Sequence, residues 1–194
     1  MNKIFCIVGK SASGKDTIYK EITSAYRNEL ISVVLGTTRP MRKGEVDGVD
    51  YHFFNDEELV ELEKDGKVIE KRQYNTMQGL WSYFTLEFDL SGEKDYILIT
   101  TLEGAHSITN RYGEDKVCVV YLTIDDKERL LRCIEREARQ VNPDYSEVCR
   151  RFIADQKDFS DDKIKEFNNI CYIDSSQSIE NCLKQWGEIY KRLK

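Results

Sequence analysis

The chain alternates short apolar runs with amphipathic stretches, which is the pattern of a parallel sheet covered by helices. Lys3–Val8, Tyr96–Thr101 and Lys116–Leu122 are almost continuously apolar, as buried parallel strands are. Ile31–Leu35 is rich in β-branched residues, and Ile170–Ile173 is expected to be a last short strand. These runs predict an α/β fold with a parallel central sheet.

Amphipathic segments between and after these runs predict the helices. Thr17–Tyr26 carries apolar residues at helical spacing, and Glu103–Tyr112 lies between two predicted strands. The terminal segment has a longer apolar stripe, formed by Ile179, Cys182, Leu183, Trp186, Ile189, Tyr190 and Leu193. Helices on both faces of the sheet give a three-layer α/β/α arrangement.

Two stretches interrupt the alternation, and we take both as inserts in one domain. Residues 36–90, the first insert, are polar, punctuated by glycine and rich in Tyr and Phe. Residues 127–158, the second insert, are a charged helical pair joined at Asn142–Asp144. The core is then residues 1–35, 91–126 and 159–194. Hairpin-like pieces are expected around Asp50–Phe54, Lys67–Arg72 and Leu80–Thr85.

Composition excludes several classes of protein. The 194 residues carry 29 Lys and Arg against 35 Asp and Glu, and this net charge of −6 argues against non-specific binding of nucleic acid. Apolar runs are far shorter than the ~18 residues that span a membrane. The 6 cysteines form no C-x-x-C pair, so we expect free thiols in a reducing cytoplasm.

A phosphate-binding loop follows the first predicted strand. The segment Gly9–Lys15 matches G-x-x-x-x-G-K and opens a predicted helix, as in P-loop NTPases. Glycines allow successive backbone N–H groups to face phosphate oxygens, and Lys15 adds a positive charge. The residues expected to bind ATP are Gly9, Lys10, Ser11, Ala12, Ser13, Gly14, Lys15, Asp16 and Thr17.

Asp16 stands where this motif normally has Ser or Thr. A carboxylate suits Mg²⁺, because hard cations prefer oxygen ligands, so Asp16 is a candidate ligand for Mg²⁺. Alternatively, Asp16 stabilises the helix N-terminus and Thr17 contacts phosphate. The sequence leaves both interpretations open.

The segment from Thr37 to Phe53 indicates the class of substrate. It reads T-T-R-P-x-R-x-G-E-V-D-G-x-D-Y-H-F, and its two arginines and tyrosine suit a phosphate group. With the phosphate loop, the chain resembles the guanylate kinase family from residue 3 to about residue 190. The resemblance implies a nucleoside-monophosphate-binding first insert in which Arg39, Arg42 and Tyr51 hold the acceptor phosphate and Glu45 supports the arginines.

The resemblance also implies a site for the base. Glu70 would accept hydrogen bonds from guanine, which offers two neighbouring N–H donors where adenine does not. Tyr83 and Thr85 match a family element displaced by a four-residue insertion within Tyr74–Trp81; they would contact phosphate and base. Leu35 replaces a base-contacting Ser. Thr100 and Thr101 stand where the family has aspartates. Glu103 or Asp16 is a candidate to replace the missing negative charge. We still expect Thr101 to belong to the base site.

Four arginines recur in the second insert at steps of three and four residues, with Leu130, Leu131, Ile134 and Ala138 on the opposing side of the predicted helix. These arginines are Arg129, Arg132, Arg136 and Arg139. In isolation this pattern fits a solvated face with weak ion pairs. After a phosphate loop it favours a mobile lid, and the resemblance implies that Arg132, Arg136 and either Arg150 or Arg151 join Lys15 in catalysis.

These observations predict an enzyme that transfers the γ-phosphoryl group of ATP, with Mg²⁺, to GMP or dGMP, giving ADP and GDP. One alternative is the same chemistry on another nucleoside monophosphate, and another is a non-catalytic interaction module on this fold. The expected partners are ATP and a purine nucleoside monophosphate, without nucleic acid or membrane. The chain is expected to be a monomer or a homodimer.

Overall fold

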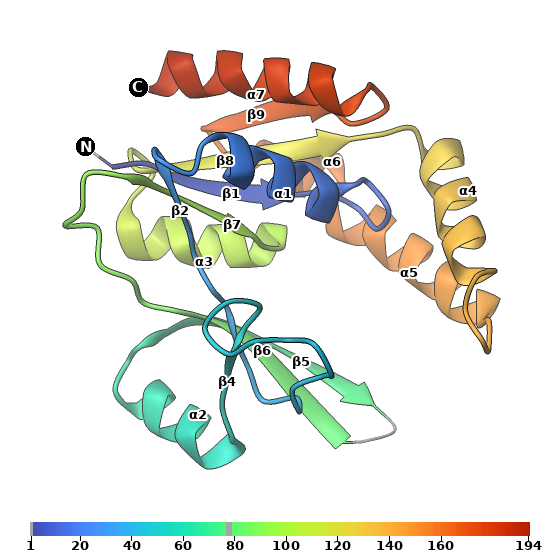
Figure 1. Ribbon diagram of the computed structural model, residues 1–194, viewed down its shortest axis with the longest axis horizontal. Helices are drawn as coiled ribbons and strands as arrows, with labels where there is room; N and C mark the ends of the chain where they lie inside the picture. Colours follow the sequence, from blue (N-terminus) through green and yellow to red (C-terminus); the bar gives the residue numbers. More distant parts are fainter. Residues whose placement is uncertain (1, 77–78) are drawn as a thin grey trace.

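A five-stranded parallel sheet forms the centre of the protein (Figure 1), as the apolar runs predicted. The structure is a computed structural model that describes residues 2–76 and 79–194. The strand order is β2-β7-β1-β8-β9. In that order the strands are Leu30–Ser32, Asp95–Ile99, Ile4–Val8, Val117–Thr123 and Ile170–Asp174.

Strand β1 lies in the middle of this sheet and is buried along its whole length. Ile4 pairs with Tyr96 of β7 on one edge and with Val117 of β8 on the other. Because both edges and both faces are covered, every residue of β1 is apolar. The loop that follows it, from Gly9, therefore leaves the carboxyl end of a fixed strand.

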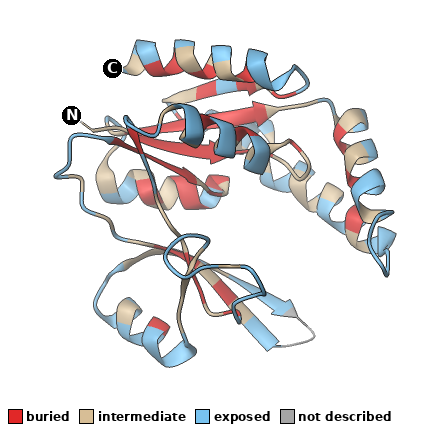
Figure 2. Cartoon of the chain, viewed as in Figure 1, coloured by how far each residue is buried: buried red, intermediate tan, exposed pale blue. Residues whose placement is uncertain are grey.

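Helices cover both faces of the sheet, and Figure 2 shows the buried residues concentrated between the layers. Helices α1 (Lys15–Ala25) and α7 (Ile179–Leu193) pack on one face, where Trp186 is fully buried and its ring centroid lies 5.0 Å from that of Phe5. Helix α3 (Leu102–Tyr112) packs on the other face, near the short α6 (Asp161–Lys165). None of the helices in the described parts of the chain is long and apolar enough to cross a membrane.

The first insert contains a separate four-stranded sheet in the order β4-β3-β6-β5. These strands are His52–Phe53, Gly36–Thr37, Gly79–Leu86 and Val68–Thr76. The hairpin-like pieces expected around Lys67–Arg72 and Leu80–Thr85 are the two partners of one antiparallel pair. The expected hairpin around Asp50–Phe54 is wrong, because β4 pairs with β3 in parallel.

Helix α2 (Asp56–Lys64) in the first insert was not expected. Asn55 and Glu58 form a reciprocal capping box at its start, in which each side chain accepts from the other's backbone N–H. This box satisfies two backbone donors that a helix end leaves free. The N-x-x-E spacing was therefore the available signal for this helix.

The two sheets are joined where β2 ends. Val33 N–H donates to Ile97 O of the central sheet, and two residues later Leu35 O accepts from His52 N–H of the smaller sheet. A hollow of about 260 Å³ lies at this junction, lined in part by Val33, His52 and Tyr96. The first insert is thus connected to the core beside a space that is not filled by side chains.

The second insert forms the predicted helical pair, α4 (Asp126–Glu137) and α5 (Tyr145–Asp158). The solvated face that the arginine spacing fits in isolation does not include Arg129, which is fully buried, whereas Leu131 and Ile134 on the opposing side are 50% and 39% exposed. The guanidinium group of Arg129 is held by two carboxylates and lies 4.0 Å from the ring centroid of Phe152. Charge pairing and stacking therefore decide which face of α4 is buried.

Gly36 in β3 tests the packing of the first insert. A Cβ atom at this position would lie 2.3, 2.5 and 2.8 Å from three ring atoms of Phe84, whose side chain is fully buried. Gly36→Ala should therefore lower the free energy of unfolding by about 1–3 kcal/mol, measured by urea denaturation. Gly92→Ala is the control, since its Cβ would meet only Tyr96 Oη at 3.6 Å. Equal free energies of unfolding of the two variants would contradict the close packing of Phe84 against Gly36.

Candidate active site

The loop after β1 has a backbone shape that requires small residues. Ala12 and Gly14 have φ angles of 60° and 83°, in the left-handed region. A Cβ atom on Gly9 would lie 2.7 Å from Ser13 Oγ and 3.0 Å from Leu122 O, so only glycine allows the turn to pack against β8. The chain reverses tightly between β1 and α1, as the motif predicted.

The N-terminus of α1 is open to an anion. Gly14 is the N-cap residue and offers no side chain to the free N–H groups of the first turn. Ser13 is fully buried, and its hydroxyl has no hydrogen-bond partner among the described residues. Free backbone donors at a helix N-terminus, with the positive end of the helix dipole, form a site suited to phosphate.

Lys15 lies at the centre of this loop. Its Nζ donates to Gly9 O at 2.6 Å and to Lys10 O at 3.0 Å. Burial lowers the pKa of Lys15 from its ordinary value, the Asp16 carboxylate opposes this change, and the Arg136 guanidinium adds to it. The lysine is therefore partly desolvated, and Arg136 of the second insert lies within electrostatic range of it.

Carboxylates of the second insert hold the outer side of the loop, which the sequence did not predict. Asp155 Oδ2 accepts from Ser11 N–H at 2.9 Å and from Arg129 Nη1 at 3.0 Å. Asp126 Oδ1 accepts from Arg129 Nε at 2.8 Å and lies 3.4 Å from Lys10 Nζ. The buried arginine thereby links α4 and α5 to the phosphate loop.

Arg39 of the first insert makes a preformed two-pronged ion pair. Its side chain is 3% exposed, and its Nη1 and Nη2 donate to the two oxygens of Glu45 at 2.7 and 2.5 Å. The hydrogen bond from Arg39, followed by that from Arg42 N–H, lowers the pKa of Glu45 to about 2. Glu45 thus contacts both predicted arginines, one through its side chain and one through its backbone. The Arg42 side chain itself is exposed.

Two tyrosines gather beside this pair. The guanidinium carbon of Arg39 lies 5.0 Å from the ring centroid of Tyr51, and the Tyr51 and Tyr83 rings pack edge to face at 5.8 Å. Burial, and then Tyr83, raise the pKa of Tyr51, and Asp16 of the phosphate loop contributes in the same direction. The structure therefore brings three predicted phosphate contacts together, within electrostatic range of the loop.

Glu70 lies deeper in the first insert, on β5 opposite Thr85 of β6. Its side chain is only 6% exposed, and Oε1 accepts from Thr85 Oγ1 at 2.7 Å. Arg72 contacts the same carboxylate, with Nη2 3.2 Å from Oε1 and Nε 3.1 Å from Oε2. Glu70 and Thr85 are thus together as predicted, and Arg72 is an addition that the sequence did not identify.

The N-terminus of α3 closes this end of the site. Thr101 is its N-cap residue, and its hydroxyl accepts from Gly104 N–H at 3.1 Å. Thr100 is buried, and its hydroxyl has no partner within the described parts of the chain. A Cβ atom on Gly104 would lie 2.1 Å from Thr100 Oγ1 and 3.4 Å from Glu70 Cδ. The hydroxyl left free beside Glu70 is therefore that of Thr100, whereas Thr101 serves as a helix cap.

Three further arginines of the second insert form ion pairs with nearby glutamates. Arg132 pairs with Glu128, and both Arg150 Nε and Arg151 Nε lie 2.6 Å from Glu147 oxygens. Glu147 raises the pKa of Arg150, and Tyr74 of the first insert adds a smaller contribution. The charge of Arg150 thus interacts with a residue of the first insert. The insertion in Tyr74–Trp81 extends the β5–β6 pair, with its residues 77 and 78 outside the described part.

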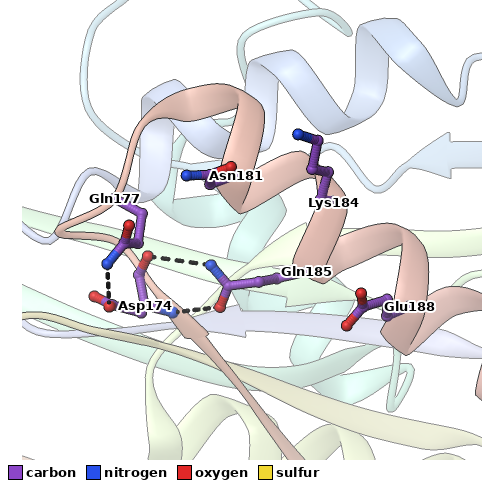
Figure 3. Close-up of a pocket in the computed structure, with 6 residues that line it drawn as sticks. All are labelled: Asp174, Gln177, Asn181, Lys184, Gln185 and Glu188. Carbon is purple, nitrogen blue, oxygen red and sulfur yellow. Dashed lines mark hydrogen bonds between the residues drawn. The ribbon is translucent and has the colours of Figure 1, made fainter.

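A second hollow lies apart from these groups, between the end of β9 and α7 (Figure 3). Gln177 and Gln185 each hydrogen-bond to Asp174 there, while Lys184 and Glu188 line the hollow from α7. Its polar groups already satisfy each other at an open surface. We therefore do not assign it to the active site.

The described residues contain no cluster of three or more His, Cys, Asp or Glu side chains that suits a metal ion. Asp16 is an exposed carboxylate in the first turn of α1, next to Lys15. One carboxylate is enough for Mg²⁺ where substrate phosphates and water supply the other ligands. The site therefore fits a cation that arrives with a nucleotide.

Comparisons of the sequence and of the structure with known proteins point to the same family. The family model described as guanylate kinase matches residues 1–185. The guanylate kinases of Thermotoga maritima and Helicobacter hepaticus are 33% and 31% identical over 142 and 135 residues, covering 70% and 69% of this chain and 67% and 66% of theirs. The chain thus spans about two thirds of the length of these curated relatives. The crystal structure of guanylate kinase from Anaplasma phagocytophilum matches with a TM-score of 0.63 at 16% identity, covering 98% of this chain and 86% of that one, which supports the fold.

Arg129 tests the link between the second insert and the loop. Arg129→Met should lower the free energy of unfolding by about 3 kcal/mol in urea denaturation, because Asp155, 15% exposed, would lose its buried partner. Arg139→Met, at an exposed position just after the C-terminal end of α4, should change stability by less than ~0.5 kcal/mol. A loss at Arg129 no larger than that at Arg139 would rule out a structural role for the pair.

Proposed function

Because the chain belongs to the guanylate kinase family, we propose that it transfers the γ-phosphoryl group of ATP to GMP or dGMP, giving ADP with GDP or dGDP respectively. The observation that carries this proposal is that two groups suited to bind phosphate lie within electrostatic range of each other. The phosphate loop with Lys15 lies on one side and the Arg39–Tyr51 group on the other, and Asp16 of the loop influences the pKa of Tyr51. A donor and an acceptor phosphate bound at these sites would face each other.

The donor is held by the loop from Gly9 to Thr17. Its backbone N–H groups and the open N-terminus of α1 bind phosphate oxygens, and Lys15 neutralises charge on the transferring group. Lys15 must exchange its bonds to Gly9 O and Lys10 O for phosphate oxygens. Its partial desolvation favours that exchange, because a desolvated ammonium gains more from an anionic partner.

The acceptor is held by the first insert, residues 36–90. Arg39, Arg42, Tyr51 and Tyr83 bind its phosphate, with Arg39 already oriented by Glu45. Glu70 accepts hydrogen bonds from the base, supported by the hydroxyl of Thr85. Thr100 adds a free hydroxyl beside Glu70, whereas Thr101 acts through the end of α3.

Catalysis rests on alignment and charge. In phosphoryl transfer, negative charge spreads over the moving group, so cations around it stabilise the transition state. Arg132, Arg136 and Arg150 or Arg151 supply these cations from residues 127–158, which act as a lid. The pairs of Arg132 with Glu128 and of Arg150 and Arg151 with Glu147 are partly exposed, and such pairs stabilise a protein by at most about 1 kcal/mol. The arginines can therefore turn toward phosphate at little cost.

Mg²⁺ would be held by phosphate oxygens and by Asp16. When bound, it neutralises charge on the donor phosphates. The Asp16 carboxylate is exposed in the first turn of α1, so it can offer an oxygen without breaking a buried contact. Thr17, next in the chain and also exposed, is left for a phosphate contact.

The cytoplasm is the proposed location, because free thiols are typical of proteins in a reducing compartment. All six cysteines are free, and Cys118 Sγ lies only 3.5 Å from Cys171 Sγ without a bond between them. Two thiols so close would be readily joined in an oxidising compartment.

The acceptor is tested by measuring ADP release from Mg-ATP with GMP, dGMP, IMP, AMP, CMP, UMP and dTMP. We expect a strong preference for GMP and dGMP, because Glu70 needs two neighbouring N–H donors on the base. Turnover of another monophosphate instead would retain the chemistry and change the substrate. Bound ATP with no turnover of any acceptor would favour a non-catalytic module.

Lys15→Ala tests the phosphate loop. We expect turnover to fall by at least ~100-fold, because one charge on the transferring phosphate supplies several kcal/mol of transition-state stabilisation. Lys20→Ala is the matched control, since Lys20 is exposed on the same helix. Turnover of the Lys15 variant within ~10-fold of the parent would reject the assignment of the loop.

A further inference from the structure

We propose that Arg72 determines base specificity by donating to O6 of guanine while Glu70 accepts from N1–H and N2–H. This inference rests on the proposed function and names a residue through which the base is selected. It starts from the ion pair between Arg72 and Glu70 in the first insert, where we expected only the Glu70 carboxylate to contact the base.

Arg72 and Glu70 lie on the same face of β5, because they are two residues apart in a strand. Glu70 is 6% exposed and Arg72 is 21% exposed, so the carboxylate lies inward and the guanidinium group stands at its outer side. Lys71 between them points to the opposite face and pairs with Glu63 at 2.5 Å. The pair therefore faces the site, and its neighbour does not.

The pair has hydrogen-bonding capacity left for a ligand. Glu70 Oε1 already accepts from Thr85 and from Arg72 Nη2. Glu70 Oε2 has only Arg72 Nε close to it, at 3.1 Å, and that buried Nε makes no hydrogen bond of acceptable geometry to a described residue. A carboxylate oxygen has two acceptor sites and a guanidinium has five N–H donors, so Oε1 is filled, whereas Oε2 keeps a free acceptor site beside the free donors of Arg72. When Arg72 Nη2 turns from Oε1 to O6 of the base, a site on Oε1 becomes free for the second N–H of guanine.

This arrangement matches one edge of guanine. Guanine carries the O6 acceptor next to the N1–H and N2–H donors, and arginine is the side chain most often used to donate to O6. Leu35, at the position of the family's base-contacting Ser, has no polar group for this purpose. An O6 atom bound without a donor would lose its hydrogen bond to water without replacement. Arg72 supplies that donor from the other side of the site.

The pairing also explains how a carboxylate can be buried before the base arrives. An isolated charge at 6% exposure would be poorly solvated, and the Arg72 guanidinium compensates it. The free donors of Arg72 and the free oxygen of Glu70 are therefore oriented in advance. Such preorganisation reduces the loss of side-chain freedom on binding.

The test compares kcat/KM for GMP, 6-thio-GMP and IMP in the parent and in Arg72→Ala. Sulfur at position 6 is a poor acceptor, whereas N1–H and N2–H are kept; IMP keeps O6 and N1–H but lacks N2–H. The parent should prefer GMP to 6-thio-GMP by about 10-fold or more, the effect of one specific contact to a base. In Arg72→Ala this preference should fall below about 3-fold, whereas the preference for GMP over IMP should remain.

Lys71→Ala and Arg72→Lys are the controls, with urea denaturation to confirm folding. Lys71→Ala should keep both preferences, and Arg72→Lys should recover part of the preference for O6, because its ammonium donates without the fork of arginine. An equal fall of kcat/KM for GMP and 6-thio-GMP in Arg72→Ala would overturn the inference. It would mean that Arg72 contacts the phosphate or has a structural role. Loss of the preference over IMP alone would mean that Arg72 acts only by positioning Glu70, which also overturns it. A parent enzyme inactive on GMP would instead overturn the proposed function.

Discussion

Pairing of arginine with carboxylate, with at least one of the two side chains buried, is the interaction on which the site depends. Arg129 with Asp126 and Asp155, Arg39 with Glu45, and Arg72 with Glu70 each remove a charge from water and compensate it at once. Each pair lies at a different part of the site: beside the phosphate loop, at the acceptor phosphate and at the base. A charge without its partner at these places would cost several kcal/mol.

The pairs also fix directions. Glu45 uses both its oxygens on Arg39, which fixes the guanidinium group over the ring of Tyr51. Asp155 fixes the Ser11 amide and the Arg129 guanidinium together, so that the outer side of the loop moves with the second insert. Groups oriented before the substrate binds need little rearrangement during the reaction. The arginines on exposed glutamates are different, because their weak pairs leave them free to move.

The sequence was sufficient for the features that depend on local pattern. Buried strands such as β1 need apolar residues on both faces, and the phosphate loop needs glycine at fixed spacing, so both were predictable. Helix α2 was missed although Asn55 and Glu58 carry its capping box, because the segment has only a weak apolar stripe around one buried residue, Leu59.

Features that depend on distant contacts were not predictable in this way. Asp155 and Ser11 are 144 positions apart, and no local sequence pattern reveals that the Asp155 carboxylate will accept a hydrogen bond from the Ser11 backbone N–H. The burial of Arg129 follows from that contact and from Phe152, which take this arginine out of the solvated face of α4. Arg72 was overlooked for the opposite reason: its spacing from Glu70 was visible, but a charged pair on a strand is more often solvent-exposed than directed at a ligand.

The position of β1 has a consequence for how the protein is made. Of the strands in this sequence, the central strand β1 is synthesised before the others, yet its partners β7 and β8 begin only at Asp95 and Val117. Its ladders therefore close long after its synthesis, and pairing between distant segments is a slow step in folding. During that interval the nascent chain carries an unpaired apolar β1, and unpaired apolar strands are prone to aggregation. Nucleotide binding, which needs Gly9 packed against Leu122, can begin only after β8 has emerged.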